Sequence, residues 1–198
     1  MKVAGIILAA GESSRMGRDK ALLEYRGATF LEHLLGLFLP RVTPVVVVLG
    51  HHADRIAATI APRVGLQVAI NANYQAGQLS SLQTGIRALP PDAPAALVTL
   101  VDHPAVAAAT IDAMLERFGS TAAALVVPRC QGRRGHPVLF SRRLLGEILA
   151  LPSSATAKQV VHAYQEEAVY LDVDDPGAVR DIDTPAEYQS LLEESPRR

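Results

Sequence analysis

A short segment near the N-terminus combines glycines with cations, and these residue types can bind phosphate. The glycines and cations between residues 10 and 20 are Gly11, Arg15, Gly17, Arg18 and Lys20. Glycine lets the backbone turn sharply and approach a ligand, so that neighbouring N–H groups can face phosphate oxygens. A forked guanidinium and the point charge of a lysine add charge-assisted hydrogen bonds. We therefore predict a triphosphate site here, in preference to a surface connector.

Three aspartates could hold a divalent cation beside that segment. Asp102 directly follows an apolar run, which aims its carboxylate toward a cleft, and Asp181 and Asp183 share one side if their segment is extended. Mg²⁺ prefers oxygen ligands and often binds through one or two carboxylates plus substrate phosphates. Asp183 could instead cap a helix beginning at Pro185. Asp181 is therefore the favoured second ligand, and Asp183 is the alternative.

Apolar runs that alternate with helical patterns must position these side chains. The runs predict strands at 3–9, 45–49, 66–70, 95–101, 122–127, 137–140 and 169–173, and helices at 30–39, 52–61, 80–88, 110–118, 142–150, 156–165 and 185–193. Strands that are apolar on both faces and alternate with helices predict an α/β fold, with a mostly parallel, Rossmann-like sheet covered by helices on both faces. Ligands bind beyond the carboxyl ends of such strands.

The regular alternation ends after Pro128, where short strands and irregular segments crowd together. We interpret that region as an inserted or edge unit that covers the end of the sheet, because the chain is short for two domains. The expected organisation is a single domain over residues 1–194 with a frayed tail over 195–198.

Composition excludes several classes of protein. A formal net charge of -1 argues against a general nucleic-acid binder. The single cysteine, Cys130, excludes an intramolecular disulfide and a cysteine-built metal cluster. No apolar run approaches the roughly 20 residues that span a bilayer, so we expect a soluble, cytoplasmic protein with no membrane or nucleic-acid partner. His51 and His52 are interpreted as helix-start residues in preference to metal ligands.

Residues 8–20 resemble the signature Leu-Ala-Ala-Gly-x-Ser-x-Arg-Met-Gly-x-x-Lys of the MobA-like NTP transferase family. The resemblance is to its molybdenum cofactor cytidylyltransferase (MocA-like) branch in particular. It continues in order through further segments at 77–85, 101–104, 135–140 and 181–185. The motifs thus extend over nearly the whole chain. The resemblance implies a fold of the nucleotide-diphospho-sugar transferase type.

The same resemblance implies an enzyme and assigns roles to its residues. The activity would be a Mg²⁺-dependent nucleotidyl transfer from an NTP, CTP by preference, to a molybdopterin-type acceptor with release of pyrophosphate. An apo molybdenum hydroxylase is a candidate partner. The implied catalytic residues are Lys20, Arg15 and Asp102; the nucleotide-binding residues are Leu8, Ala9, Ala10, Gly11, Arg15, Lys20, Asn73, Gln78, Ser80 and Ser81; the metal ligands are Asp102 with Asp181 or Asp183; and the acceptor-binding residues are Arg134, Gly135 and His136.

The sequence leaves alternatives to this activity open. The chain could be a guanylyltransferase, a sugar-phosphate nucleotidyltransferase, or a non-catalytic protein that holds the finished cofactor for a molybdenum hydroxylase. His103 stands where the family often has glutamine, and residues 152–158 lack the Gly-Asp-x-Gly pattern of many relatives. That pattern is associated with the acceptor site, so these departures concern the identity of the acceptor.

Overall fold

The apolar runs of the N-terminal half form parallel strands of one sheet. β1 (Ala4–Ala9) pairs in parallel with β4 (Val45–Leu49) on one side and with β6 (Ala95–Leu100) on the other, and β5 (Leu66–Ile70) extends the sheet beyond β4. β4 consists of valines and a leucine, and β-branched side chains favour the extended backbone. The computed structural model describes residues 2–121 and 123–194, so the tail expected at 195–198 lies outside the described residues.

The strands after residue 124 continue the same sheet. β9 (Val138–Ser141) runs antiparallel between β6 and β7 (Leu125–Cys130), β10 (Ala168–Asp172) pairs in parallel with β7, and the short β8 (Arg133–Arg134) folds back on β7. The region therefore forms one edge of the sheet, in agreement with the interpretation as an edge unit, but the expectation that it covers the end of the sheet is wrong. Its strands are part of the sheet and bring it to the order β10-β7-β9-β6-β1-β4-β5.

Pro128 does not end β7, although the sequence suggested that it closes this strand. The pairing of β7 with β9 ends at Val126, and its pairing with β8 begins at Arg129. Pro128 lies between these two ladders, and neither of them includes it. The absence of an N–H on proline therefore costs no hydrogen bond with β9 or β8.

Helices cover both faces of the sheet, as expected. They are α1 (Phe30–Phe38), α2 (Ala53–Ala57), α3 (Gln78–Arg87), α4 (Ala108–Ser120), α5 (Arg142–Ala150), α6 (Ala157–Ala163) and α7 (Pro185–Glu193). Short 3₁₀ helices are η1 (Lys20–Leu22), η2 (Tyr74–Ala76) and η3 (Pro176–Val179). Outside the main sheet, β2 (Glu24–Tyr25) pairs with β3 (Ala28–Thr29) in a hairpin. Among the described helices, none is long and apolar enough to cross a membrane.

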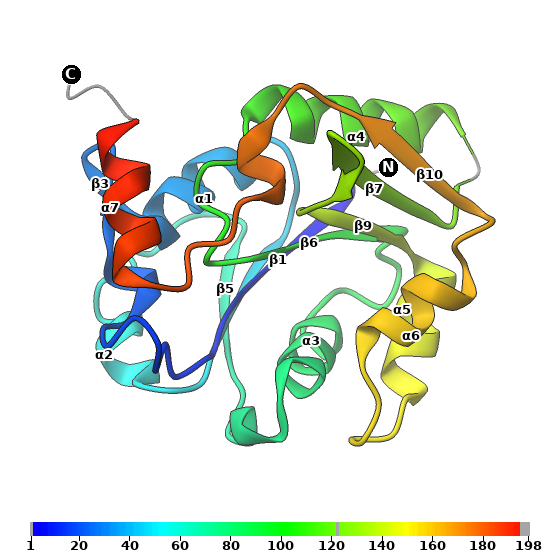
Figure 1. Cartoon of the computed structure of the whole chain (residues 1–198). Coiled ribbons are helices and arrows are strands. Elements are labelled where there is room, and N and C mark those ends of the chain that lie inside the picture. Colours follow the sequence, from blue (N-terminus) through cyan, green and yellow to red (C-terminus); the bar gives the residue numbers. More distant parts are fainter. Residues whose placement is uncertain (1, 122, 195–198) are drawn as a thin grey trace.

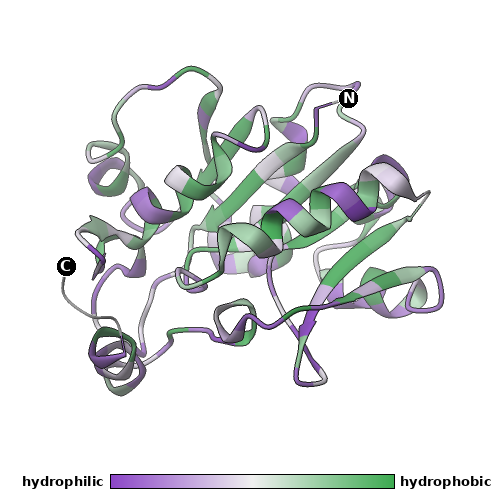
Figure 2. Cartoon of the chain, turned by 90° about the horizontal axis from the view of Figure 1, so that it is seen from above, coloured by the Kyte–Doolittle hydropathy of each residue, from purple (hydrophilic) through white to green (hydrophobic). Residues whose placement is uncertain are grey.

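Alternate residues of the central strands enter two hydrophobic cores. In β1, Ile7 packs into the core shared with α1, α4 and α7, while Ile6 packs into the core shared with α3, α5 and α6. Figure 1 shows these two sets of helices on opposite faces of the sheet, and Figure 2 shows that the strands between them are largely hydrophobic. The expected α/β fold with a mostly parallel sheet is confirmed. The exact limits of the domain stay a prediction.

Candidate active site

A cavity of about 340 Å³ lies beyond the carboxyl ends of β1 and β6. This is where an open parallel sheet places its ligands. The walls come from the end of β1, the loop after it, the start of α3, the end of β6 and the segment before α7. The lining residues are Leu8, Ala9, Ala10, Gly11, Ser13, Ser14, Arg15, Asp19, Lys20, Ala21, Ile56, Tyr74, Gly77, Gln78, Ser81, Leu100, Val101, Asp102 and Asp183.

The loop after β1 contains a turn whose hydrogen bonds are accepted by the carbonyl oxygen of Ser13. That oxygen accepts hydrogen bonds from the N–H groups of Met16 and Gly17, both at 3.0 Å. Gly17 has φ +70°, a left-handed conformation that favours glycine, and the Met16 side chain is buried in the core on the α1 side. The Ser13 hydroxyl then accepts a hydrogen bond from the Lys20 N–H at 3.2 Å. These contacts fix where the loop ends, and Lys20 is turned into the protein.

Lys20 joins two aspartates that are far apart in sequence. Its Nζ donates to Oδ2 of Asp102 at 2.9 Å and makes a short contact with Oδ1 of Asp183. The three side chains are only 10%, 19% and 16% exposed, respectively. The N–H of Ile182 donates to the Asp102 carbonyl at 2.9 Å, which holds the two acidic segments side by side. The fold therefore assembles one cation and two carboxylates at the cavity.

The charges in this cluster shift the pKa values of Lys20 and Asp183. Burial alone would lower the pKa of Lys20, but the charge of Asp102 and the hydrogen bonds to both aspartates outweigh it, so the pKa is raised above 10.5. Burial acts to raise the pKa of Asp183, yet its hydrogen bond to Lys20 and the charges of Lys20 and Arg15 lower it below 3.8. Lys20 and Asp183 are therefore both charged near neutral pH.

The cluster fits a divalent cation through Asp102 and Asp183. Oδ1 of Asp102 is buried and has no hydrogen-bond partner among the described residues, so one hard oxygen ligand is unused. Asp183 faces the same cavity, and its Oδ2 lies 2.7 Å from NH2 of Arg15, whose side chain is 70% exposed. Because an exposed arginine can move aside, this second carboxylate is also accessible to an ion.

Asp181 does not line the cavity and is exposed, so the structure does not support the preference for it as the second ligand. The reason given against Asp183 was helix capping. Thr184 caps α7 instead: its hydroxyl accepts from the Glu187 N–H, and Glu187 returns the bond to the backbone N–H of Thr184. The Asp183 side chain is consequently free to face Lys20.

Most of the predicted nucleotide-binding residues line the cavity, but Asn73 and Ser80 do not. The hydroxyl of Ser80 is occupied inside its own loop, where it donates to the carbonyls of Asn73 and Gly77 and accepts from the Asn71 amide. This network shapes the turn before α3. Leu8 to Gly11, Gln78 and Ser81 remain candidates for nucleotide contact together with Arg15 and Lys20.

The predicted acceptor-binding residues, Arg134, Gly135 and His136, do not line the cavity. A Cβ on Gly135 would come within 2.2 Å of the Ala178 carbonyl, so close packing against η3 already explains this glycine. The Arg134 guanidinium lies over the ring of Tyr170, 4.8 Å from its centre. Burial and then the neighbouring His103 lower the pKa of His136 to about 4. His136 is therefore neutral near pH 7 and cannot offer an acceptor phosphate a positive charge.

Some lining residues were not among the predicted set. Ile56 reaches the cavity from α2 and Tyr74 from η2. Tyr74 stands next to Asn73, which was predicted, so its position in the same loop could have indicated it. The sequence indicated only that Ile56 lies on the apolar face of a helix. An apolar residue at such a position can face either the core or a cavity, and the sequence alone does not distinguish the two.

This chain is similar in sequence to known proteins over nearly its full length. A family model described as the MobA-like NTP transferase domain matches residues 5–169. The molybdenum cofactor cytidylyltransferase of Escherichia coli K12 is 25% identical, over 95% of this chain and 94% of the relative. The probable molybdenum cofactor guanylyltransferase of Mycobacterium marinum is 31% identical, over 94% of this chain and 92% of the relative.

Solved structures show the same architecture. The crystal structure of Rv0371c from Mycobacterium tuberculosis H37Rv has a TM-score of 0.85 at 30% identity and covers 98% of both chains. The same protein in complex with manganese has a TM-score of 0.81 and covers 98% of this chain and all of the other. These comparisons confirm the family resemblance and the fold.

Proposed function

The chain belongs to the MobA-like NTP transferase family, and from this premise we propose the substrates of a nucleotidyltransferase. It transfers CMP from CTP to a molybdopterin-type acceptor that bears a phosphate, and pyrophosphate is released. The observation that carries the proposal is the convergence of Lys20, Asp102 and Asp183 on one cavity beside the loop after β1. The full-length relatives named as molybdenum cofactor nucleotidyltransferases support the choice of acceptor.

The chemistry follows from charge and position. An oxygen of the acceptor phosphate attacks the α-phosphorus of CTP, and the bond from that phosphorus to the bridging oxygen of pyrophosphate breaks. Lys20 and Arg15 neutralise phosphate charge from the loop side. The acceptor phosphate is already ionised, so no general base is required, and catalysis rests on positioning and electrostatic stabilisation.

Asp102 and Asp183 are the residues that would hold Mg²⁺. The ion, when bound, would neutralise charge on the α-phosphate and help to orient it. The two carboxylates by themselves hold Lys20 in place and keep it protonated, because they raise its pKa. A molybdenum hydroxylase that receives the product remains an expected partner.

Guanylyl transfer is the second candidate function. The observation in its favour is the 31% identity to a relative named as a probable guanylyltransferase, against 25% to the named cytidylyltransferase. One experiment distinguishes cytidylyl and guanylyl transfer from cofactor holding and from transfer to a sugar phosphate. Purified protein is incubated with molybdopterin, Mg²⁺ and each NTP in turn. Released pyrophosphate is quantified, and the product is identified by mass. Absence of pyrophosphate with every nucleotide would favour a protein that only holds the cofactor. Transfer to a sugar phosphate but not to molybdopterin would overturn the proposed acceptor.

The base preference can be tested at Ala10. Its side chain is 4% exposed, and the residue lines the cavity where β1 ends. The Cβ of Ala10 takes room from the larger purine base, and glycine at this position would restore that room. Methyl-sized differences in such pockets are worth about 1–3 kcal/mol. We expect kcat/KM for CTP to exceed that for GTP by about 10-fold or more, and Ala10→Gly to narrow this ratio.

Ala4→Gly is the matched control, since it removes the same methyl group from a buried alanine of the same strand that does not line the cavity. Steady-state kinetics with both nucleotides should give an unchanged ratio for this variant. Preference for GTP in the unmodified protein would overturn the cytidylyl assignment and leave the guanylyl one.

A further inference from the structure

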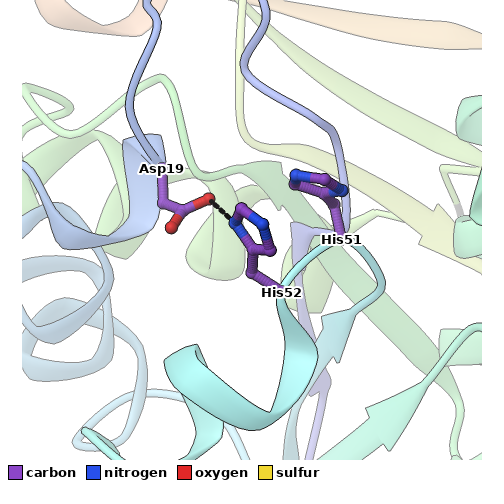
Figure 3. A group of neighbouring side chains, drawn as sticks. All are labelled: Asp19, His51 and His52. Atoms are coloured by element: carbon purple, nitrogen blue, oxygen red, sulfur yellow. Dashed lines mark hydrogen bonds and ion pairs between the residues drawn. The ribbon is translucent and has the colours of Figure 1, made fainter.

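A second group of possible metal ligands lies where the end of the loop after β1 meets the turn before α2. It consists of Asp19, His51 and His52, and each offers one ligand atom within 4.8 Å of the other two (Figure 3). Oδ1 of Asp19 lies 2.9 Å from Nδ1 of His52, and the centres of the two imidazole rings are 3.7 Å apart. None of these residues was predicted to bind a metal.

The backbone brings the two rings together. Successive side chains of an extended segment point to opposite sides, so neighbouring histidines after a strand would ordinarily diverge. His52 instead has φ 50°, a left-handed conformation that is uncommon outside glycine and carries some strain. His52 precedes α2 but makes no side-chain capping bond to it. Its ring is turned toward Asp19 instead.

Asp19 is aimed at this group from the other side. Its side chain is only 6% exposed, and it makes no capping bond to the turn that follows, η1. Oδ2 of Asp19 lies 3.3 Å from NH1 of Arg55, which leaves Oδ1 directed at His52. Nδ1 of His51 lies 3.4 Å from the Tyr74 hydroxyl, so Nε2 of His51 is available as the ligand atom.

We propose that Asp19, His51 and His52 form a binding site for a divalent transition-metal ion of the zinc type. Two imidazoles and one carboxylate suit zinc, cobalt or nickel, whereas Mg²⁺ prefers oxygen ligands alone. Ligand atoms around a tetrahedral zinc stand about 3.4 Å apart, so side-chain movements on the order of 1 Å would close the group around an ion. Three protein ligands leave a fourth position for water.

The site is accessible and distinct from the carboxylates at Lys20. The three ligands line a second cavity of about 570 Å³ that includes neither Asp102 nor Asp183, although Asp19 lines both cavities. The His52 side chain is 51% exposed. Arg55 is the nearest like charge, but its side chain is 69% exposed and can turn toward solvent. An ion here would tie the loop that carries Lys20 to the turn between β4 and α2.

The test is metal binding by the full chain without nucleotide. Protein freed of metal by a chelator is titrated with Co²⁺, which is read by its visible ligand-field absorption, and with Zn²⁺ by calorimetry. We expect one ion per chain with nitrogen ligation. Losing an outer contact to a metal ligand costs 10–100-fold in affinity, so losing a ligand itself in His51→Ala or Asp19→Asn should cost at least about 100-fold. His52→Asn should cost as much and keeps a residue that tolerates the left-handed backbone.

Two controls separate this site from other sources of binding. His162→Ala removes an exposed histidine of α6 and should leave the Co²⁺ spectrum unchanged. Asp102→Asn should also leave it unchanged, which distinguishes the site from the one proposed for Mg²⁺. Absence of a Co²⁺ spectrum, or a spectrum that disappears with Asp102→Asn but survives His51→Ala and His52→Asn, would overturn the proposal without affecting the proposed function.

Discussion

Replacing Lys20 with alanine is expected to lower kcat/KM for nucleotide transfer by about 10²–10³-fold, the typical cost of removing one preorganised charged or hydrogen-bonding group. The Lys20 side chain is 10% exposed and is held by Asp102 and Asp183, so its charge is in place before the substrate arrives. Its raised pKa keeps it protonated near neutral pH. The measurement is steady-state release of pyrophosphate from the NTP at saturating metal.

The controls for this prediction address charge and packing separately. Lys20→Met keeps the buried aliphatic stem without its charge and should lose activity to the same extent as the alanine variant. Arg18→Ala removes a cation from the same loop, but the Arg18 guanidinium lies 5.8 Å from the ring centre of Tyr188 and does not line the cavity at Lys20. That variant should stay within a few-fold of the unmodified protein. Near-normal turnover of both Lys20 variants, with unchanged melting curves, would contradict the assignment of Lys20.

Strands β4 and β5 were predictable because their signal is local. The limits expected for β4 and β5 agree with those observed, at Val45–Leu49 and Leu66–Ile70. In β4 all five side chains are buried, so an uninterrupted apolar run bounded by Pro44 and Gly50 defines the strand. Gln67 and Val68 of β5 are exposed, yet the turn residues beside this strand still limit it.

Shorter elements escaped prediction because they carry no periodicity. The β2–β3 hairpin has only two residues in each strand, joined by Arg26 and Gly27, both at positive φ. α2 ends at Ala57, earlier than the apolar pattern suggested, and β8 consists of two arginines that nothing in their type marks as a strand. The limits of such short elements depend on contacts with the rest of the fold, and a single sequence does not reveal those contacts.

The same distinction applies to the site. The ends of β1 and β6 could be located from their runs of apolar residues, so the positions of Gly11 and Asp102 at one edge of the sheet followed from topology alone. The choice between Asp181 and Asp183 depended on contacts with Lys20 and Arg15 across more than 160 residues of chain, which spacing does not encode. The proximity of Asp19 to His51 and His52 was invisible for the same reason.

Asp102→Asn is expected to abolish metal-dependent transfer, with a loss of at least about 10²-fold, while leaving stability nearly unchanged. The substitution keeps the shape of the side chain, and an amide oxygen can still accept the hydrogen bond from Lys20. Oδ1 of Asp102 has no hydrogen-bond partner among the described residues, and Nε2 of His103 lies 4.0 Å from it, so removing its charge breaks no hydrogen bond there. The free energy of unfolding should change by no more than about 1 kcal/mol, the usual net contribution of one hydrogen bond.

A pair of neighbouring variants makes this prediction specific to a metal at the cavity. Asp183→Asn removes the second cavity-facing carboxylate and should also cost at least about 10²-fold in transfer. Asp181→Asn makes the same change two residues earlier on an exposed side chain outside the cavity, so activity should be retained. Pyrophosphate release is measured against Mg²⁺ concentration for all three proteins alongside thermal melting. If Asp102→Asn and Asp183→Asn remain active, the ion is held elsewhere. If Asp102→Asn and Asp181→Asn fail while Asp183→Asn remains active, the ligand set is Asp102 with Asp181, and the geometry of the Lys20 cluster does not describe the metal-bound site.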